Sequence, residues 1–191
     1  MQFERLALAG AWLIRPEPIR DERGFFARSF CAEEFAAHGL KPGFAQCNIS
    51  FNARKGTLRG MHFQRPPHEE AKLVRCTAGA IHDVIVDLRP GSPTRGQWVA
   101  AELTAENRHM LYVPEGFAHG FKTLADATEV FYQMGTAFVP GAGAGLRHDD
   151  PALAIDWPPG DIVISDKDLS YPDFDSLPPE SLAAPMRTGA G

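Results

Sequence analysis

Two histidines stand among apolar residues in segments typical of β-strands. His62 lies in LRGMHFQ, residues 58–64, and His119 lies in VPEGFAHGF, residues 113–121. Imidazole titrates near neutral pH without a large perturbation, so each is a candidate general base, and imidazole is also a common metal ligand. A hydrogen-bonded core histidine is the third interpretation, and for any single strand histidine it is the more frequent one.

The metal interpretation lacks part of its ligand set. A histidine-based site in a small β-barrel requires two imidazoles two residues apart on one strand face, a following carboxylate and a third imidazole on a distant strand. Gln64 stands two residues after His62, so the imidazole pair is missing, and an amide is a poor substitute. We therefore expect no catalytic metal.

The acid–base interpretation also needs a proton donor and a cation for a developing oxyanion. Tyr132, in EVFYQMG, shares a strand face with Val130 and Met134, so its phenol is expected to project with apolar side chains. Lys72, in AKLVRC, shares a face with Val74, an unusual place for a solvated ammonium. The alternatives are a core tyrosine with its hydroxyl bonded and a lysine that extends to the barrel rim.

Four cations in otherwise neutral or acidic segments are candidates for binding a phosphate-bearing ligand. They are Arg23, Arg59, Lys72 and Lys167. In a regular strand Arg59 and His62 point to opposite faces. If both serve one pocket, Gly60 must mark a bulge or kink.

Short apolar or alternating runs separated by Gly, Pro, Asn and Asp must position these residues. This pattern predicts an all-β protein, a jelly-roll sandwich or barrel, with a short helix over residues 31–39. In AIHDVIVDL apolar side chains fall on both faces, which indicates a strand covered twice. We expect one domain over residues 1–175 and a flexible tail over 176–191.

Composition excludes several classes of protein. The formal net charge of −5 gives no general attraction to nucleic acid. No apolar run reaches the roughly 18 residues of a membrane span, and no secretory signal is recognisable, so we expect a cytoplasmic protein. The cysteines at 31, 47 and 76 have no CxxC spacing, which argues against a disulfide framework or a thiolate zinc site.

Many separated motifs, in order from about residue 10 to residue 170, resemble one family of nucleotide-sugar epimerases, the dTDP-4-dehydrorhamnose 3,5-epimerases. The motifs are DERGFFARSF, QCNIS, TLRGMHFQ, AKLVR, DVIVDLRPGSPTRGQW, LTAENRHMLYVPEGFAHGF, AIDWP and SDKD. The resemblance implies a cupin-type jelly roll, a homodimer, no cofactor or metal, and a nucleotide-diphosphate sugar as substrate.

The resemblance also implies roles for individual residues. His62 matches the family's base, Asp168 the carboxylate that orients it, Tyr132 the acid and Lys72 the cation beside the enolate oxygen. Phe138 stands where the family often has a tyrosine that stacks on the nucleotide base. The implied substrate-binding residues are Arg23, Phe26, Gln46, Asn48, Arg59, Lys72, His119, Phe138 and Lys167.

Three positions depart from the family pattern. Arg28 and Gly143 stand where glutamates are usual, and Gln133 replaces a frequent lysine. The nucleotide, the sugar, and whether C3, C5 or both are inverted therefore stay open, a CDP-linked sugar included. A metal-dependent cupin, a non-catalytic sugar-nucleotide binder and a 3,4-ketoisomerase relative are the rival interpretations.

Overall fold

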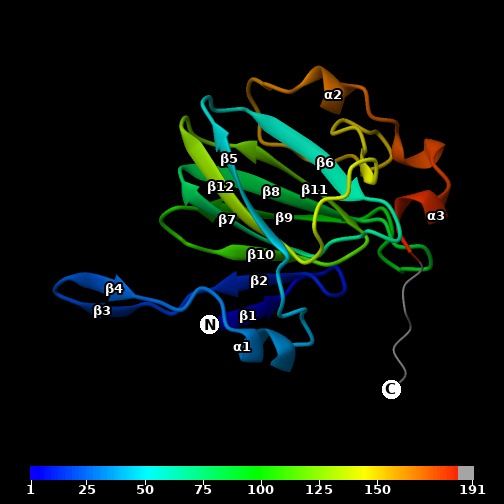
Figure 1. Cartoon of the computed structure of the whole chain (residues 1–191). Coiled ribbons are helices and arrows are strands. Elements are labelled where there is room, and N and C mark those ends of the chain that lie inside the picture. The colour runs from blue at the N-terminus through cyan, green and yellow to red at the C-terminus, as the bar shows by residue number, and fades with distance from the viewer. Residues whose placement is uncertain (185–191) are drawn as a thin grey trace.

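The computed structural model describes residues 1–184, which form two facing antiparallel β-sheets (Figure 1). The six-stranded sheet contains, in spatial order, β1 (Gln2–Arg5), β2 (Trp12–Arg15), β10 (Met110–Val113), β7 (Lys72–Ala78), β12 (Thr128–Met134) and β5 (Gln46–Asn52). The five-stranded sheet contains β13 (Gly143–Gly145), β6 (Leu58–Gln64), β11 (Phe117–Thr123), β8 (Ala80–Asp87) and β9 (Trp98–Thr104). The predicted all-β jelly roll is confirmed.

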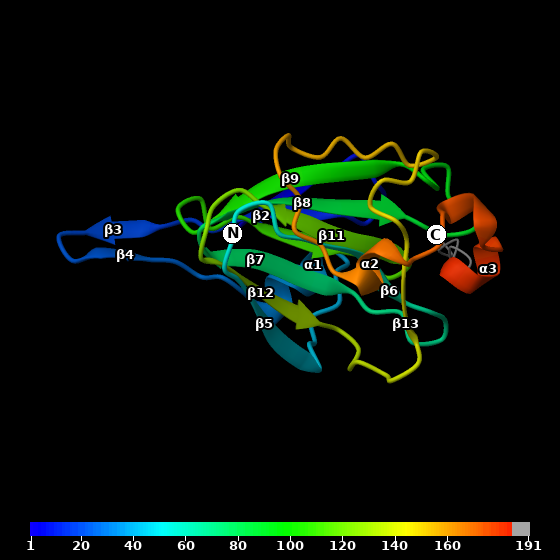
Figure 2. The same ribbon diagram turned by 90° about the horizontal axis from the view of Figure 1, so that it is seen from above.

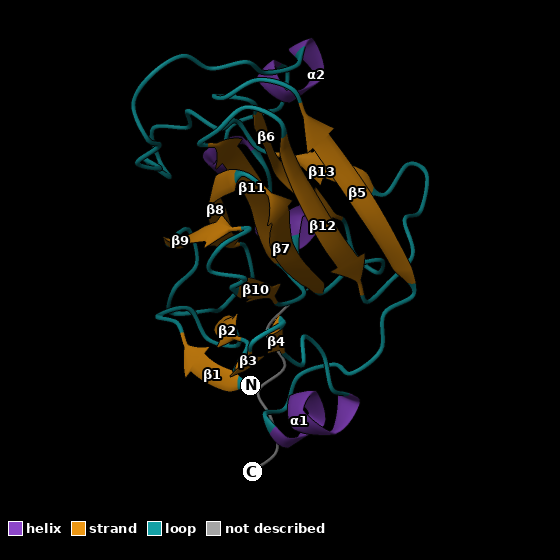
Figure 3. Ribbon diagram, turned by 90° about the vertical axis from the view of Figure 1, so that its left-hand side faces the viewer, coloured by secondary structure: helices purple, strands orange, loops and turns teal. Residues whose placement is uncertain are grey.

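The helices are short, as predicted, and Figure 3 shows α1 and α2 at opposite ends of the molecule. They are α1 (Ala32–Ala37), α2 (Asp166–Leu169), the 3-10 helix η1 (Phe174–Ser176) and α3 (Pro179–Leu182). The helix predicted over residues 31–39 is α1, which buries Phe35 against the six-stranded sheet. Gly39, in the left-handed region at φ 72°, follows its end.

Strand β8 is covered on both faces, as its sequence predicted. Ile81 and Ile85 belong to the core between the two sheets, whereas Val84 and Val86 belong to a second apolar cluster. The second cluster is completed by the chain's own C-terminal segment, which includes Leu153 and Phe174 and the α3 residue Leu182. No second subunit is needed to cover this strand.

The expected tail differs from the structure over its first part. Leu182 and Ala183 are fully buried in the second cluster, so the prediction of a flexible tail from residue 176 is wrong for residues 176–184. The apolar side chains of this segment complete the cover on the outer face of the five-stranded sheet, which its composition did not reveal. The rest of that prediction, residues 185–191, lies outside the described part of the chain.

A hairpin of β3 (Ile19–Asp21) and β4 (Gly24–Phe26) extends beyond the sandwich at the end opposite α3 (Figure 2). Every residue of the two strands is exposed, including the apolar Ile19 and Phe26. An isolated two-stranded hairpin is marginally stable in water, so this one is expected to gain from packing against another surface. Within the described residues no helix is both long and apolar enough to cross a bilayer.

Candidate active site

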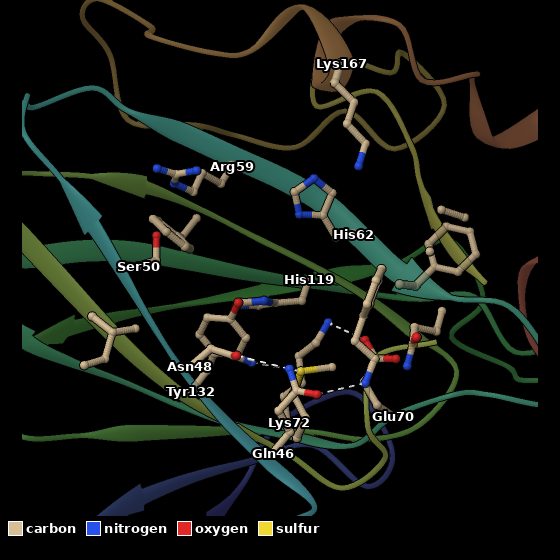
Figure 4. Close-up of a pocket in the computed structure, with 18 of the residues that line it drawn as sticks. Gln46, Asn48, Ser50, Arg59, His62, Glu70, Lys72, His119, Tyr132 and Lys167 are labelled. Carbon is tan, nitrogen blue, oxygen red and sulfur yellow. Dashed lines mark hydrogen bonds and ion pairs between the residues drawn. The ribbon is translucent and has the colours of Figure 1, made fainter. Parts of the chain in front are cut away.

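A cavity of about 670 Å³ lies between the two sheets, a size typical of small-molecule sites (Figure 4). Strands β5, β7 and β12 line it from one side, and β6, β11 and β13 from the other. Lys167 of α2 and Tyr171, just after that helix, complete the lining. The predicted site residues that the cavity brings together are Gln46, Asn48, Arg59, His62, Lys72, His119, Tyr132, Phe138 and Lys167.

Strand register explains the contribution of the six-stranded sheet. Met134 of β12 pairs with Lys72 of β7 on one side and with Gln46 of β5 on the other. Two residues along, Tyr132 pairs with Asn48. Side chains at paired positions share a sheet face, and residues two apart return to it, so all of them point into the same cavity.

A bulge in β6 places both Arg59 and His62 in the cavity. His62 pairs with His119 of β11, but Arg59 pairs with Phe121, so β6 carries one residue more than β11 over this stretch. Gly60 is the extra residue. Its φ is 142°, and a Cβ at this position would lie 2.5 Å from the Cα of Gly120. The bulge predicted at Gly60 is confirmed.

His62 is held by a carboxylate from a different element. Its Nε2 lies 2.8 Å from Oδ1 of Asp168 on α2, and the backbone N–H of Gly60 donates to Oδ2 at 3.3 Å. Burial raises the pKa of Asp168, but the hydrogen bond and charge of His62 and the Gly60 N–H outweigh it, so that pKa is lowered overall. Ser165 caps α2 by accepting from the Asp168 N–H, which fixes the carboxylate's position.

His119 has its own carboxylate, which sequence reasoning missed. Its Nε2 lies 2.6 Å from Oδ1 of Asp83 on the neighbouring strand β8, and both side chains are buried. The sequence placed Asp83 on a buried strand face with Ile81 and Ile85, and a buried carboxylate needs a partner. That signal was available without the structure.

Tyr132 presents a phenol that no described residue engages in a hydrogen bond, so its proton is available to a ligand. Burial raises the pKa of this phenol, the nearby Arg59 lowers it and the carboxylate of Glu70 raises it, with a net increase. The group therefore stays protonated at neutral pH. Lys72, beside it in the cavity, is buried as its position in the strand suggested, and its Nζ lies 3.0 Å from Oε1 of Glu70.

Two aromatic rings rest on glycines of β13, which share one face of that strand. A Cβ at Gly143 would lie 3.2 Å from the Phe138 ring, and one at Gly145 would lie 2.4 Å from the Tyr171 ring. Gln46 accepts the Phe138 N–H at 3.1 Å, which ties this ring to β5. Tyr171 meets His62 edge-on, with ring centroids 5.8 Å apart, and was not predicted as a site residue.

Two predicted binding residues, Arg23 and Phe26, lie outside this cavity. Both belong to the projecting hairpin, where the Arg23 side chain is 82% exposed and Phe26 is 72% exposed. Among the departures from the family pattern, Arg28 pairs with Glu34 at 2.9 Å. Gln133 points away from the cavity because it alternates with Tyr132.

The donor atoms of the described residues do not favour a metal. No group of three or more His, Cys, Asp and Glu side chains in residues 1–184 is arranged to hold an ion. His62 and His119 each bond a carboxylate through Nε2. The cavity instead combines imidazole, phenol and several cations, a set suited to proton transfer next to a carbonyl.

The chain folds as a cupin-type jelly roll, with these side chains gathered in a cavity between its two sheets. The family model described as dTDP-4-dehydrorhamnose 3,5-epimerase matches residues 5–176, and the chain belongs to that family.

Relatives and a solved structure extend the comparison over nearly the whole chain. The dTDP-4-dehydrorhamnose 3,5-epimerase of Sinorhizobium fredii is 46% identical over 93% of this chain and 92% of its own. A dTDP-4-dehydrorhamnose 3-epimerase of Streptomyces niveus is 40% identical over 88% of this chain and 81% of its own. A Legionella pneumophila dTDP-6-deoxy-D-glucose-3,5-epimerase, solved with dTDP-4-keto-L-rhamnose, has a TM-score of 0.90 at 36% identity and covers 97% of this chain and 98% of its own.

Proposed function

We propose that the protein epimerises a nucleotide-diphospho-4-keto-6-deoxyhexose by removing and returning a proton on a carbon next to the C4 ketone. The observation that carries the proposal is the placement of His62 and Tyr132. They project into one cavity from opposite sheets (Figure 4). A base and an acid so arranged can reach the two faces of one ring carbon, and this is what inversion requires.

His62 acts as the base and Asp168 orients it. Because the Nε2–H donates to Asp168, Nδ1 is the nitrogen that accepts the substrate proton. The Asp168 carboxylate then stabilises the imidazolium, as carboxylates do beside other catalytic histidines. Tyr132 delivers a proton to the opposite face of the carbon.

Lys72 stabilises the enolate oxygen that forms between these two steps. A fixed cation in a largely buried cavity acts on the developing charge without reorganising, which is commonly a large part of such a rate enhancement. Arg59 and Lys167, at the mouth of the same cavity, carry the charge that a diphosphate requires. Gln46, Asn48, His119 and Phe138 complete the binding surface.

The dTDP-linked sugar is the substrate we favour, because the ligand of the Legionella pneumophila relative is a dTDP-linked 4-keto sugar. Inversion of C3 alone is a specific second candidate, because the Streptomyces niveus relative, 40% identical, is a 3-epimerase. Incubation of dTDP-4-keto-6-deoxyglucose in deuterated water, with exchanged positions counted by NMR, separates the two. Deuterium at both C3 and C5 supports the 3,5-epimerase, and deuterium at C3 alone supports the second candidate. No exchange with this sugar or its CDP, UDP and GDP counterparts refutes an epimerase.

We also propose that the protein works as a homodimer in the cytoplasm, with the hairpin of one subunit at the cavity of the other. In such a dimer Arg23 and Phe26 contact the substrate bound in the cavity of the partner subunit, because both side chains are exposed and neither lines the cavity of its own chain. The outer face of β5, with Ile49 64% and Phe51 59% exposed, supplies apolar area for the interface. A mass measurement in solution tests the dimer. A monomer that is fully active would refute it.

A further inference from the structure

One charged group in the cavity has no part in the steps proposed so far. Glu70 precedes β7 by two residues and lines the cavity beside Lys72 (Figure 4). The Glu70 side chain is 4% exposed and that of Lys72 is 8% exposed, with Nζ and Oε1 3.0 Å apart. An ion pair so far removed from water contributes little net stability and is therefore expected to have another use.

We propose that Glu70 is a positioning residue of the reaction, which holds the Lys72 ammonium aimed at the substrate and keeps the Tyr132 phenol protonated. This inference rests on the proposed function, because it gives Glu70 a part in stabilising the enolate and in returning the proton.

The effect on Lys72 follows from its surroundings. A buried ammonium is costly without an opposite charge, and the other cations of the cavity, Arg59 and Lys167, disfavour it further. Glu70 supplies the opposite charge. Its Oε1 takes one of the three ammonium donors, which leaves the remaining donors for a ligand oxygen.

Glu70 also affects the protonation of Tyr132. Only the neutral phenol can give a proton to the enolate carbon. Burial raises its pKa, Arg59 lowers it, and the negative charge of Glu70 raises it. One carboxylate therefore holds the Lys72 ammonium in place and favours the protonated form of the Tyr132 phenol.

No other carboxylate in the described residues of the cavity is free for this task. Asp168 of α2 bonds His62, Asp83 of β8 bonds His119, and neither aspartate lines the cavity itself. The titratable and charged side chains that line the cavity are Arg59, His62, Glu70, Lys72, His119, Tyr132, Lys167 and Tyr171.

The test compares pH profiles of kcat for Glu70→Gln and the wild-type enzyme. Loss of the negative charge lets the Tyr132 phenol lose its proton more easily, so the alkaline limb is expected to move to lower pH by about one unit. KM is expected to change much less than kcat, because the nucleotide contacts stay intact. Glu70→Asp, which keeps the charge one methylene further away, should lie between the two.

Glu69→Gln is the matched control, since Glu69 bonds the Ala184 N–H and does not line this cavity. The Glu69→Gln enzyme should keep the alkaline limb of the wild-type pH profile. An unchanged limb in a folded Glu70→Gln enzyme overturns the inference; if that variant does not fold, an unchanged limb in Glu70→Asp does so. Failure of the proposed function is a different result, namely a wild-type protein that exchanges no deuterium with any 4-keto sugar.

Discussion

Two histidine–aspartate pairs lie side by side in this molecule, on neighbouring strands and in direct register. His62 of β6 pairs with His119 of β11, and each Nε2 bonds an aspartate, at 2.8 and 2.6 Å. Their surroundings differ. The His62 side chain is 41% exposed and its carboxylate comes from α2, whereas the His119 side chain is 9% exposed and its carboxylate comes from the middle of β8.

Under the proposed function, this difference lets one residue type serve two purposes. A base must exchange its proton with a ligand, so it needs an open side, which His62 has. His119 is enclosed together with Asp83 in the sheet, where a fixed donor or acceptor helps to hold a ligand but has less freedom to cycle protons. Hydrogen-bonded pairing alone therefore does not identify the base.

The largest expected effect separates the two histidines directly. His62→Ala should abolish deuterium exchange, a loss of roughly 10²–10⁴-fold or more, because the base is gone. His119→Ala should keep measurable exchange while KM rises, because it removes a binding group. The measurement is deuterium incorporation by NMR at several substrate concentrations. Equal loss of exchange in both variants would contradict the distinction.

Tyr132→Phe tests the proposed acid, which faces the more exposed of the two pairs, His62–Asp168. The ring fills the same volume, so binding should persist, but the proton for the second face is lost. Product formation should slow by roughly 10²-fold or more, while the first exchange at C3 or C5 slows less. A parallel decrease of both rates would indicate a structural role for Tyr132.

Most of the fold could be predicted from the sequence because the signals that specify it are local. Alternating runs and turn residues predict the strands, and the pattern of AIHDVIVDL predicts a strand buried on both faces, as β8 is. Gly60 predicted the bulge that brings Arg59 and His62 together. The role of residues 176–184 depends on a distant surface, so composition suggested a tail where the chain packs.

Within the site, the predicted residues were those with distinctive chemistry in a strand pattern. Asp83 was missed because its partner, His119, lies on another strand. Glu70 was missed because it contributes through Lys72, two residues further along the chain. Tyr171 was missed because the contact with Gly145 that brings it to His62 joins segments far apart in the chain. In the proposed dimer, the position of Arg23 and Phe26 relative to a cavity depends on how the two subunits are arranged, which local patterns do not encode.

The two aspartates offer a smaller contrast that depends on pH. Because the pKa of Asp168 is lowered in the folded protein, its stabilising effect is present above the ordinary carboxyl pKa of 3.8 and is lost as pH falls through the lower folded value. Asp168→Asn should reduce kcat by roughly 10- to 100-fold, the range found when the hydrogen-bond partner of a functional histidine is removed at metal sites. Its melting temperature should approach that of the wild type as pH falls below about 4.

Asp83→Asn is the matched comparison for this measurement. It should reduce stability by about 1–3 kcal/mol at neutral pH, because a fully buried hydrogen bond to a charged group is weakened. Its effect on kcat should be smaller than that of Asp168→Asn. The reverse order of kcat would place the base on the other pair.

The smallest expected effect comes from Gly145→Ala, at the residue of β13 that pairs directly with His62 in the sheet. A methyl group at this position would lie 2.4 Å from the Tyr171 ring, so the ring must move and its edge contact with His62 must change. The buried pair lies on β11 and β8, away from β13, and should stay as it is. We expect kcat to fall a few-fold, roughly 1 kcal/mol, with a smaller change in melting temperature.

Gly143→Ala, which meets the Phe138 ring at the milder distance of 3.2 Å, is the control and should affect nucleotide affinity rather than kcat. If both substitutions change kcat equally, the Tyr171 ring has no particular influence on His62. The solvent exposure of the His62 side chain alone then accounts for its role as the base.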